Sequence, residues 1–364
     1  DLFEKYEFGS LRKFLGDVKP AARKQTDTVR FSEASPEEVT ASAFKDSKCA
    51  IITDADGETV LAKATKVTAA AYGPDGTVIV AEGPAERFSD LISATDIAKY
   101  GYDLKRQFTV LGNSGLETGG KLMDIELMHY LINPEKSHKV EILAKSYLDI
   151  NLEECLPEKK EEAPLSLFDE APEEEAAADE RFPEAVATLQ LGDAIWKEMG
   201  EADLCGLYER MEEPLLAVLS DMEMEGVKID LPQLRKYASA LAAEMNEIQE
   251  RVREMAEEPA LNIMSPKQVG ILLYEKMNLD PKVKMKGAMR NYPTDEDTLN
   301  ALADKHPIIN EILEYRGVKK LLSTYIEPLP SYISSVTGKI HTTFNQALTA
   351  TGRLSSSKPN LQNI

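Results

Sequence analysis

The chain has 364 residues, of which 63 are acidic and 42 are lysine or arginine, giving a formal net charge of −21. This length allows two or three domains with cores of their own, and the net charge taken alone argues against a nucleic-acid partner. The three cysteines, Cys49, Cys155 and Cys205, have no metal-binding or redox spacing, which offers no disulfide framework and fits a reducing cytoplasm.

Signals for export or membrane insertion are missing from the sequence. No apolar run approaches the roughly 18 residues of a membrane span, and no signal peptide opens the chain. We therefore expect a cytoplasmic location and no membrane partner. The chain begins at Asp1 without methionine and stops abruptly at Ile364, so we also expect it to be a piece of a longer protein.

The first half of the chain predicts a short helix followed by a mixed α/β region. Spaced apolar residues give residues 1–16 one irregular apolar face, as in a charged helix. Alternating and apolar runs then predict strands at 48–53, 66–72 and 77–81, the last two joined by a tight turn. Helices are predicted at about 84–94, 103–112, 123–133 and 139–147.

Charge is distributed unevenly along the chain. Residues 153–184 carry an acidic excess of roughly ten charges with little apolar surface to bury, which predicts a mobile insertion. From Leu261 onward the balance reverses, with thirteen lysines and arginines against nine acidic residues. The net charge of the whole chain therefore does not describe its C-terminal third.

Long amphipathic helices are predicted from Cys205 onward. One ends at Gly226, and Asp230 is placed to cap the next. Apolar residues recur along this second helix at spacings of three, four and seven, namely Leu234, Leu241, Met245, Ile248, Val252 and Met255. Such a seam is typical of a core, and a dimeric coiled coil is the alternative. Near the end of the chain, residues 339–345 alternate as a strand does.

Six short motifs follow one another in the second half of the chain. They are Ser265-Pro-Lys-Gln268, Tyr292-Pro-Thr-Asp295, Glu311-Ile-Leu-Glu-Tyr-Arg316, Leu322-Ser-Thr-Tyr325, Gly338-Lys-Ile-His341 and the polar segment from Leu348 to Ile364. In this order and near this spacing, they resemble the thumb and the start of the palm in family A DNA polymerases, the bacterial DNA polymerase I family. The likeness is close for residues 203–364 and weaker for residues 1–200.

The resemblance implies a fold of class α/β plus α. Residues 1–26 would form an N-terminal linker helix. Residues 27–200 would form a ribonuclease H-like domain of the 3′–5′ exonuclease type, with a mixed sheet and helices. A mainly helical thumb would follow at 201–330, and the first strands of a polymerase palm, truncated here, at 331–364.

An exonuclease of this type needs carboxylates that hold two divalent cations about 4 Å apart. The resemblance assigns these positions, in degenerate form, to Asp54, Asp56 and Asp103. Glu180 and Glu184 stand where the family has a tyrosine and an aspartate, so we predict a vestigial domain that holds no metal. Active proofreading is the alternative. Asp54 and Asp56 are equally typical of a turn at a strand end, and Asp103 of a helix N-cap.

A second group of residues is predicted to bind primer–template DNA. Ser265 and Gln268 match a capping box with Pro266 at the first helical position, which would present free backbone N–H groups to a phosphate. Alternating lysines at 282–286 could form a sequence-independent phosphate contact, although such a run is more often a solvated edge. Arg353 matches a family arginine that reaches acceptors common to all base pairs in the minor groove. The full predicted set is Asn262, Ser265, Lys267, Lys282, Lys284, Lys286, Thr294, Arg316, Lys320, Arg353, Asn360 and Gln362.

The resemblance implies that the parent protein is a DNA-directed DNA polymerase, a nucleotidyltransferase of replication and repair. Such a parent would use Mg²⁺ and deoxynucleoside triphosphates, and we expect it to be a monomer. Its palm aspartates would lie beyond Ile364, so this stretch is predicted to bind DNA without polymerising and to need no cofactor of its own. The alternatives are a working 3′–5′ exonuclease and a purely DNA-binding or structural fragment.

Overall fold

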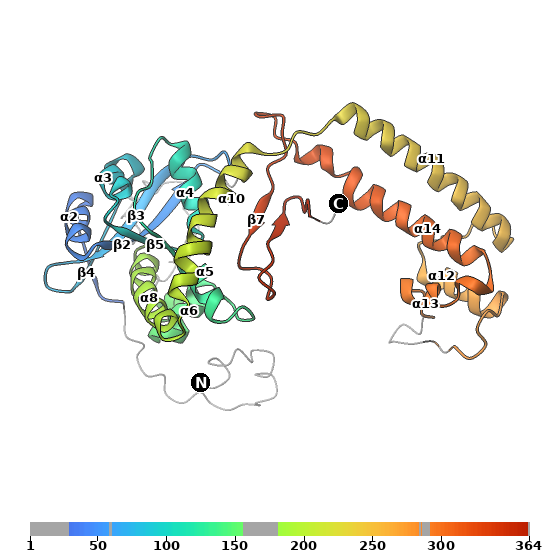
Figure 1. The fold of residues 1–364 in the computed structure, drawn as a ribbon, viewed down its shortest axis with the longest axis horizontal. Helices are drawn as coiled ribbons and strands as arrows, with labels where there is room; N and C mark the ends of the chain where they lie inside the picture. The colour runs from blue at the N-terminus through green and yellow to red at the C-terminus, as the bar shows by residue number, and fades with distance from the viewer. Residues whose placement is uncertain (1–28, 58–59, 156–180, 284, 286–291, 363–364) are drawn as a thin grey trace, which may run out of the picture. The chain divides into compact units, whose positions relative to one another are not determined.

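A computed structural model describes residues 29–57, 60–155, 181–283, 285 and 292–362 (Figure 1). Contacts divide the chain into two compact units: unit 1 contains residues 1–225 and 343–357, and unit 2 contains residues 226–342 and 358–364. The predicted linker helix at 1–26 and most of the predicted acidic insertion lie outside the described residues. In the described ranges, no helix is long and apolar enough to cross a membrane.

Unit 1 is built on a six-stranded mixed sheet with the order β1-β4-β3-β2-β5-β6. β2 pairs antiparallel with β3 and β3 with β4, whereas β1–β4, β2–β5 and β5–β6 are parallel. The central strands are made of small and β-branched residues buried on both faces, which confirms the strands predicted from apolar runs. The strand bounds are β1 Phe31–Glu33, β2 Lys48–Ala55, β3 Ala64–Tyr72, β4 Val78–Pro84, β5 Ala98–Gly101 and β6 Leu122–Asp124.

Helices pack around this sheet, and α8 lies against β2, β3, β4 and β5. The predicted helix at 123–133 is corrected at its start: Leu122 and Met123 join the sheet as β6, and Asp124 caps the helix that follows by accepting the N–H groups of Glu126 and Leu127. The bounds are α2 Pro36–Asp46, η2 Ala85–Phe88, α3 Ser89–Ser93, α4 Leu104–Asn113, α5 Ile125–Ile132, α6 Val140–Leu148, α7 Leu152–Cys155, α8 Arg181–Glu201, α9 Cys205–Leu207, η3 Tyr208–Glu212 and α10 Glu213–Glu225.

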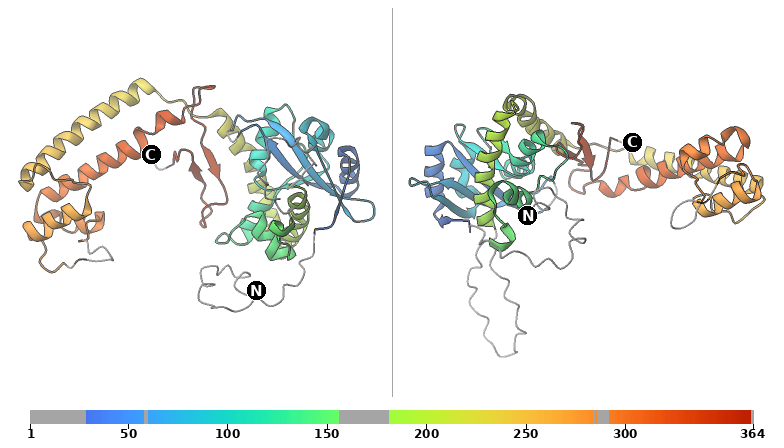
Figure 2. Two further views of the ribbon diagram at one scale, coloured as in Figure 1. Left: turned by 180° about the vertical axis from the view of Figure 1, so that it is seen from behind. Right: turned by 90° about the horizontal axis from the view of Figure 1, so that it is seen from below.

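Unit 2 is helical, and α11 runs beside α14 along most of its length (Figures 1 and 2). Asp230 caps α11 as predicted, by accepting the N–H of Gln233. Ile248 and Val252 on the predicted seam pack in one core with Ile312 of α14, whereas Leu234, Met245 and Met255 of the seam are only partly buried. The bounds are α11 Leu231–Ala256, α12 Pro266–Gly270, η4 Ile271–Lys276, α13 Glu296–Asn300, η5 Ala303–Lys305, α14 Ile308–Lys320, η6 Leu321–Ile326 and η7 Leu329–Tyr332.

A short hairpin, β7 Thr343–Asn345 and β8 Ser355–Ser357, packs as part of unit 1. The strand predicted at 339–345 is regular only over its last three residues. Ile340 instead exchanges two backbone hydrogen bonds of 2.8 Å with Val227 inside unit 2. α10 also packs with unit 1, although the sequence placed it in the thumb. The predicted domain boundaries at 200 and 330 therefore remain predictions.

A pair of histidines is buried beside α5 and α6. His129 Nδ1 lies 2.8 Å from His138 Nδ1, and the His129 side chain is only 4% exposed. Burial, with His138 adjacent, lowers the pKa of His129 to about 4. His129 is therefore neutral in the folded chain at pH values where the unfolded chain, with a histidine pKa near 6.5, binds a proton.

Acidification is therefore expected to destabilise unit 1 through His129. The free energy of unfolding should fall by about 2 kcal/mol as the pH drops from about 6.5 to about 4, because only the unfolded state gains the proton. Urea unfolding at several pH values would measure this, with His129→Gln expected to flatten the dependence and His306→Gln, in unit 2, to leave it unchanged. Equal slopes for the wild type and His129→Gln would contradict the assignment.

Candidate nucleic-acid interface

Asp54, the first candidate exonuclease carboxylate, is held by cations of the protein itself. It lies where β2 bulges, between Asp54 and Ala55. Its Oδ1 accepts a hydrogen bond of 2.9 Å from Arg181 Nη2, and Lys66 Nζ lies 3.8 Å from Oδ2. Arg181 also pairs with Glu184 at 2.9 Å, so one guanidinium joins two carboxylates. Lys66 pairs more closely with Glu82, at 2.8 Å, so Arg181 is the nearer cation to Asp54.

The other two candidate carboxylates serve the local backbone. Asp56 Oδ1 accepts the N–H of Lys63 at 2.7 Å, which closes the loop after β2. Asp103 has a positive φ of 49° and caps α4 by accepting the N–H of Arg106 at 3.4 Å. These are the turn and N-cap roles that the sequence left open. Asp54, Asp56 and Asp103 are thus each bound by groups of the protein, and within the described ranges no three His, Cys, Asp or Glu side chains are grouped so that they could hold a metal ion.

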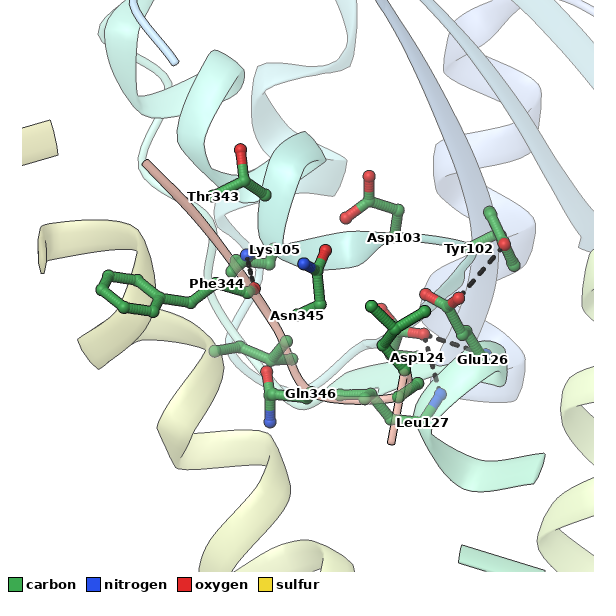
Figure 3. Close-up of a pocket in the computed structure, with 13 residues that line it drawn as sticks. Tyr102, Asp103, Lys105, Asp124, Glu126, Leu127, Thr343, Phe344, Asn345 and Gln346 are labelled. Atoms are coloured by element: carbon green, nitrogen blue, oxygen red, sulfur yellow. Dashed lines mark hydrogen bonds between the residues drawn. The ribbon is translucent and has the colours of Figure 1, made fainter. Parts of the chain in front are cut away.

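A cavity of about 240 Å³ within unit 1 is lined by Asp103, but not by Asp54 or Asp56 (Figure 3). Asp124 in its wall is 2% exposed and accepts three backbone N–H groups, from Leu104 at 2.6 Å, Glu126 at 2.9 Å and Leu127 at 3.2 Å. Burial raises the pKa of Asp124 to about 8, whereas these donors favour its charged form. Asp124 is not among the predicted site residues, although an aspartate directly before an apolar helical run is a cap signal.

In unit 2, residues at the start of α12 form a structured polar turn. Ser265 Oγ accepts the N–H of Gln268 at 3.4 Å, as the predicted capping box requires. The second half of the box is corrected: Gln268 Oε1 accepts the N–H of Asn262 at 2.8 Å instead of the N–H of Ser265. Asn262 Oδ1 in turn accepts the N–H of Met264 at 3.0 Å. This network leaves the side chains of Asn262 and Lys267 exposed.

Two predicted DNA contacts in unit 2 have little exposed surface in the structure, and their DNA-binding role stays a prediction. Arg316 is half-buried: its Nε donates to Ile263 O at 3.2 Å and its Nη1 donates to Thr294 O. Desolvation lowers the pKa of this guanidinium. Thr294 is only 5% exposed. Arg316 therefore ties Ile263, the residue after Asn262 in the turn before α12, to the segment at Thr294.

The remaining predicted contacts that can be described are exposed. Lys282 and Lys320 of unit 2 are exposed, whereas Lys284 and Lys286 lie outside the described residues. Arg353 is exposed in the loop between β7 and β8 of unit 1, where its carbonyl accepts the Thr349 hydroxyl at 2.6 Å. Asn360 and Gln362 of unit 2 are also exposed, and Asn360 Oδ1 accepts the N–H of Gln362 at 3.0 Å.

Comparison with known proteins identifies the chain. A family model described as DNA polymerase family A matches residues 231–364. DNA polymerase I of Bacillus subtilis is 38% identical over 283 residues, covering 77% of this chain and 31% of the relative. DNA polymerase I of Caldicellulosiruptor bescii is 29% identical over 364 residues, covering 99% of this chain and 36% of the relative. The chain belongs to DNA polymerase family A.

A solved family A structure extends the likeness to most of the fold. The POL domain of Pol1 from M. smegmatis, in complex with DNA primer-template and dNTP, matches with a TM-score of 0.74 and 27% identity. The match covers 92% of this chain and 56% of that one. The chain spans about a third of the length of the curated relatives given above. The predicted DNA contacts all lie in the stretch that matches the family model, and the exonuclease candidates lie outside it.

Proposed function

We propose that this chain is part of a DNA polymerase of the polymerase I type, and that it holds primer–template DNA without joining nucleotides itself. The observation that carries the proposal is the exposure of Asn262, Lys267, Lys282 and Lys320 within the stretch that matches family A. A similar structure solved with DNA primer-template and dNTP supports the same kind of ligand.

In this proposal the residues of the chain bind the duplex without reading its sequence. The ammonium groups of Lys267, Lys282 and Lys320 neutralise phosphates and release bound counterions. Arg353, Asn360 and Gln362 donate to acceptors that every correct base pair presents in the minor groove. Arg316 holds the α12 turn in place through Ile263 and Thr294. Such contacts test the geometry of the duplex, which suits a protein that must accept any template.

The sheet of unit 1 is proposed to be a ribonuclease H-like domain that keeps its fold without proofreading. The pairing of Asp54 with Arg181 and Lys66 supports this, because it gives the carboxylate partners other than a metal ion. In the parent polymerase, Mg²⁺ would supply charge stabilisation for nucleotide transfer. No step of that reaction is assigned to the residues of this chain.

Replacement of Lys320 by alanine is expected to weaken binding of a primer–template duplex equally for all sequences. The slope of log K against log salt should become shallower by about 1, because one phosphate contact is lost. Fluorescence anisotropy at two or more salt concentrations would measure this, with Lys45→Ala on α2 as an exposed-lysine control in unit 1.

The same preparation provides the test of inactivity. With Mg²⁺ and all four deoxynucleoside triphosphates, the wild-type chain is expected to leave a labelled primer unextended. Templated incorporation would contradict that part of the proposal. Duplex binding that does not change with salt would contradict the part that assigns phosphate contacts to the lysines.

A further inference from the structure

A buried ion pair links two helices of unit 1. Lys105 of α4 and Glu223 of α10 pair through Nζ and Oε1, with side chains that are 9% and 7% exposed. Taking both charges out of water is costly, and an apolar pair of similar volume would often be at least as stable. Packing of α4 against α10 therefore does not by itself account for a buried ion pair at this position.

Both members of the pair bind the same residue of strand β7. The N–H of Phe344 donates to Glu223 Oε1 at 2.7 Å, and Lys105 Nζ donates to the carbonyl oxygen of Phe344 (Figure 3). The carboxylate thus meets the one backbone donor of Phe344, and the ammonium meets its one acceptor. The ion pair brackets a single residue of the strand backbone.

The bonds from Lys105 and Glu223 lie on the edge of β7 that does not pair with β8. In an antiparallel ladder, alternate residues direct their N–H and C=O groups away from the partner strand. Phe344 lies opposite Ser356, between the Thr343–Ser357 and Asn345–Ser355 pairs. Its backbone groups bond to side chains of α4 and α10 in the way that a third strand would bond to them. A strand edge completed in this way has a fixed register, because a shift by one residue would turn these groups over.

Two further bonds tie the same hairpin to unit 1. Gln346 Nε2 donates to Glu212 Oε2 at 2.9 Å, and the hydroxyl of Tyr130 donates to Thr349 O at 2.8 Å. The second bond lies four residues from Arg353, in the loop that presents this arginine. Strand β7 and the loop after it are therefore held by residues of α4, α5, η3 and α10.

We propose that Lys105 and Glu223 are positioning residues that set the register and place of the β7–β8 hairpin, and through it the place of Arg353. The fold of unit 1 would then serve DNA binding as a support for this loop. The role of the pair in fixing the hairpin stands by itself, whereas its consequence for DNA rests on the proposed function.

Amide hydrogen exchange in the wild-type chain and two variants tests the bracket. Glu223→Leu removes the acceptor for Phe344 N–H, so exchange of that amide should speed up at least tenfold relative to the core amide of Ala70 in β3. Glu223→Gln keeps an oxygen at the same place and should stay within about threefold of the wild type. Lys48→Met, which breaks an ion pair away from the hairpin, is the matched control. It should leave the exchange rate of Phe344 relative to Ala70 unchanged.

If the Phe344 and Ala70 amides in Glu223→Leu exchange faster by the same factor, the positioning role is overturned, because this would show only a general loss of stability. An equal acceleration in Glu223→Gln and Glu223→Leu would also overturn it, because the oxygen would then be irrelevant.

Duplex binding by Glu223→Leu and Arg353→Ala separates this inference from the proposed function. Weaker binding in both, together with faster exchange of Phe344, supports both. Faster exchange with unchanged binding in both variants supports the positioning role and rejects the assignment of Arg353 to DNA. Weaker binding by Glu223→Leu without faster exchange overturns the positioning role.

Discussion

Replacement of Lys99 by methionine is expected to lower the free energy of unfolding by about 3 kcal/mol. Lys99 is fully buried at the start of β5, and its ammonium donates to the carbonyl oxygens of Ala94, Ile97 and Gly119. Methionine fills the same volume but leaves three acceptors without a donor. Each unsatisfied buried group costs about 1–3 kcal/mol, partly offset because the charge itself is no longer desolvated.

Urea unfolding followed by circular dichroism would measure this loss. Lys45→Met is the matched control, because Lys45 is exposed in the last turn of α2 and its replacement should change stability by less than about 0.5 kcal/mol. A loss below about 1 kcal/mol for Lys99→Met would mean that water or a local shift satisfies the three carbonyls. Burial also lowers the pKa of Lys99, because desolvation disfavours the charged ammonium.

The fold of unit 1 follows from local patterns wherever those patterns are strong. The apolar runs at 48–53 and 66–72 became β2 and β3, because consecutive small and β-branched residues suit a strand buried on both faces. Asp103 takes the N-cap role that the sequence left open, and in unit 2 Asp230 caps α11 as predicted, because an N-cap depends only on the next three residues. The helix predicted at 123–133 begins later, at Ile125, because Met123 and Asp124 pair with β5 as part of β6.

The candidate site was less predictable, because its contacts join residues far apart in the chain. Helical spacing places Arg316 and Lys320 on one face of α14, but spacing does not reveal which part of that face is covered. Arg316 is bound to the carbonyls of Ile263 and Thr294, whereas Lys320 is exposed. Likewise, no local signal pairs Asp54 with Arg181, which lies 127 residues further along the chain.

In unit 1 the first candidate exonuclease carboxylate belongs to a network of ion pairs within the protein. Asp54 and Glu184 are joined through Arg181, so each charge in this group has a partner in the protein. The sheet keeps its buried core and still supplies α4, whose Lys105 binds Phe344. Packing of the core and the proposed placement of the hairpin constrain this domain independently of any role of its carboxylates.

Replacement of Gly192 by alanine is expected to lower the free energy of unfolding by about 2–3 kcal/mol, against the usual gain from alanine in a helix. Gly192 lies in α8 where this helix crosses β5. A Cβ atom there would lie 2.1 Å from Tyr100 Cδ1 and 2.6 Å from Cε1. Tyr100 is 6% exposed, so its ring has little room to move, and α8 would have to shift away from the sheet.

Gly200→Ala provides the control, because Gly200 lies in the same helix and a Cβ there meets only Cys205 Sγ, at 4.0 Å. It should be neutral or stabilising by up to about 1 kcal/mol, the ordinary preference of a helix for alanine. Urea unfolding gives the change in the free energy of unfolding for each variant. A loss in Gly192→Ala with no loss in Gly200→Ala is caused by the contact with Tyr100 and not by alanine itself. Equal effects of the two substitutions would show that α8 does not lie this close to Tyr100. Lost stability in Gly192→Ala alone would place the helix against the sheet where glycine is required.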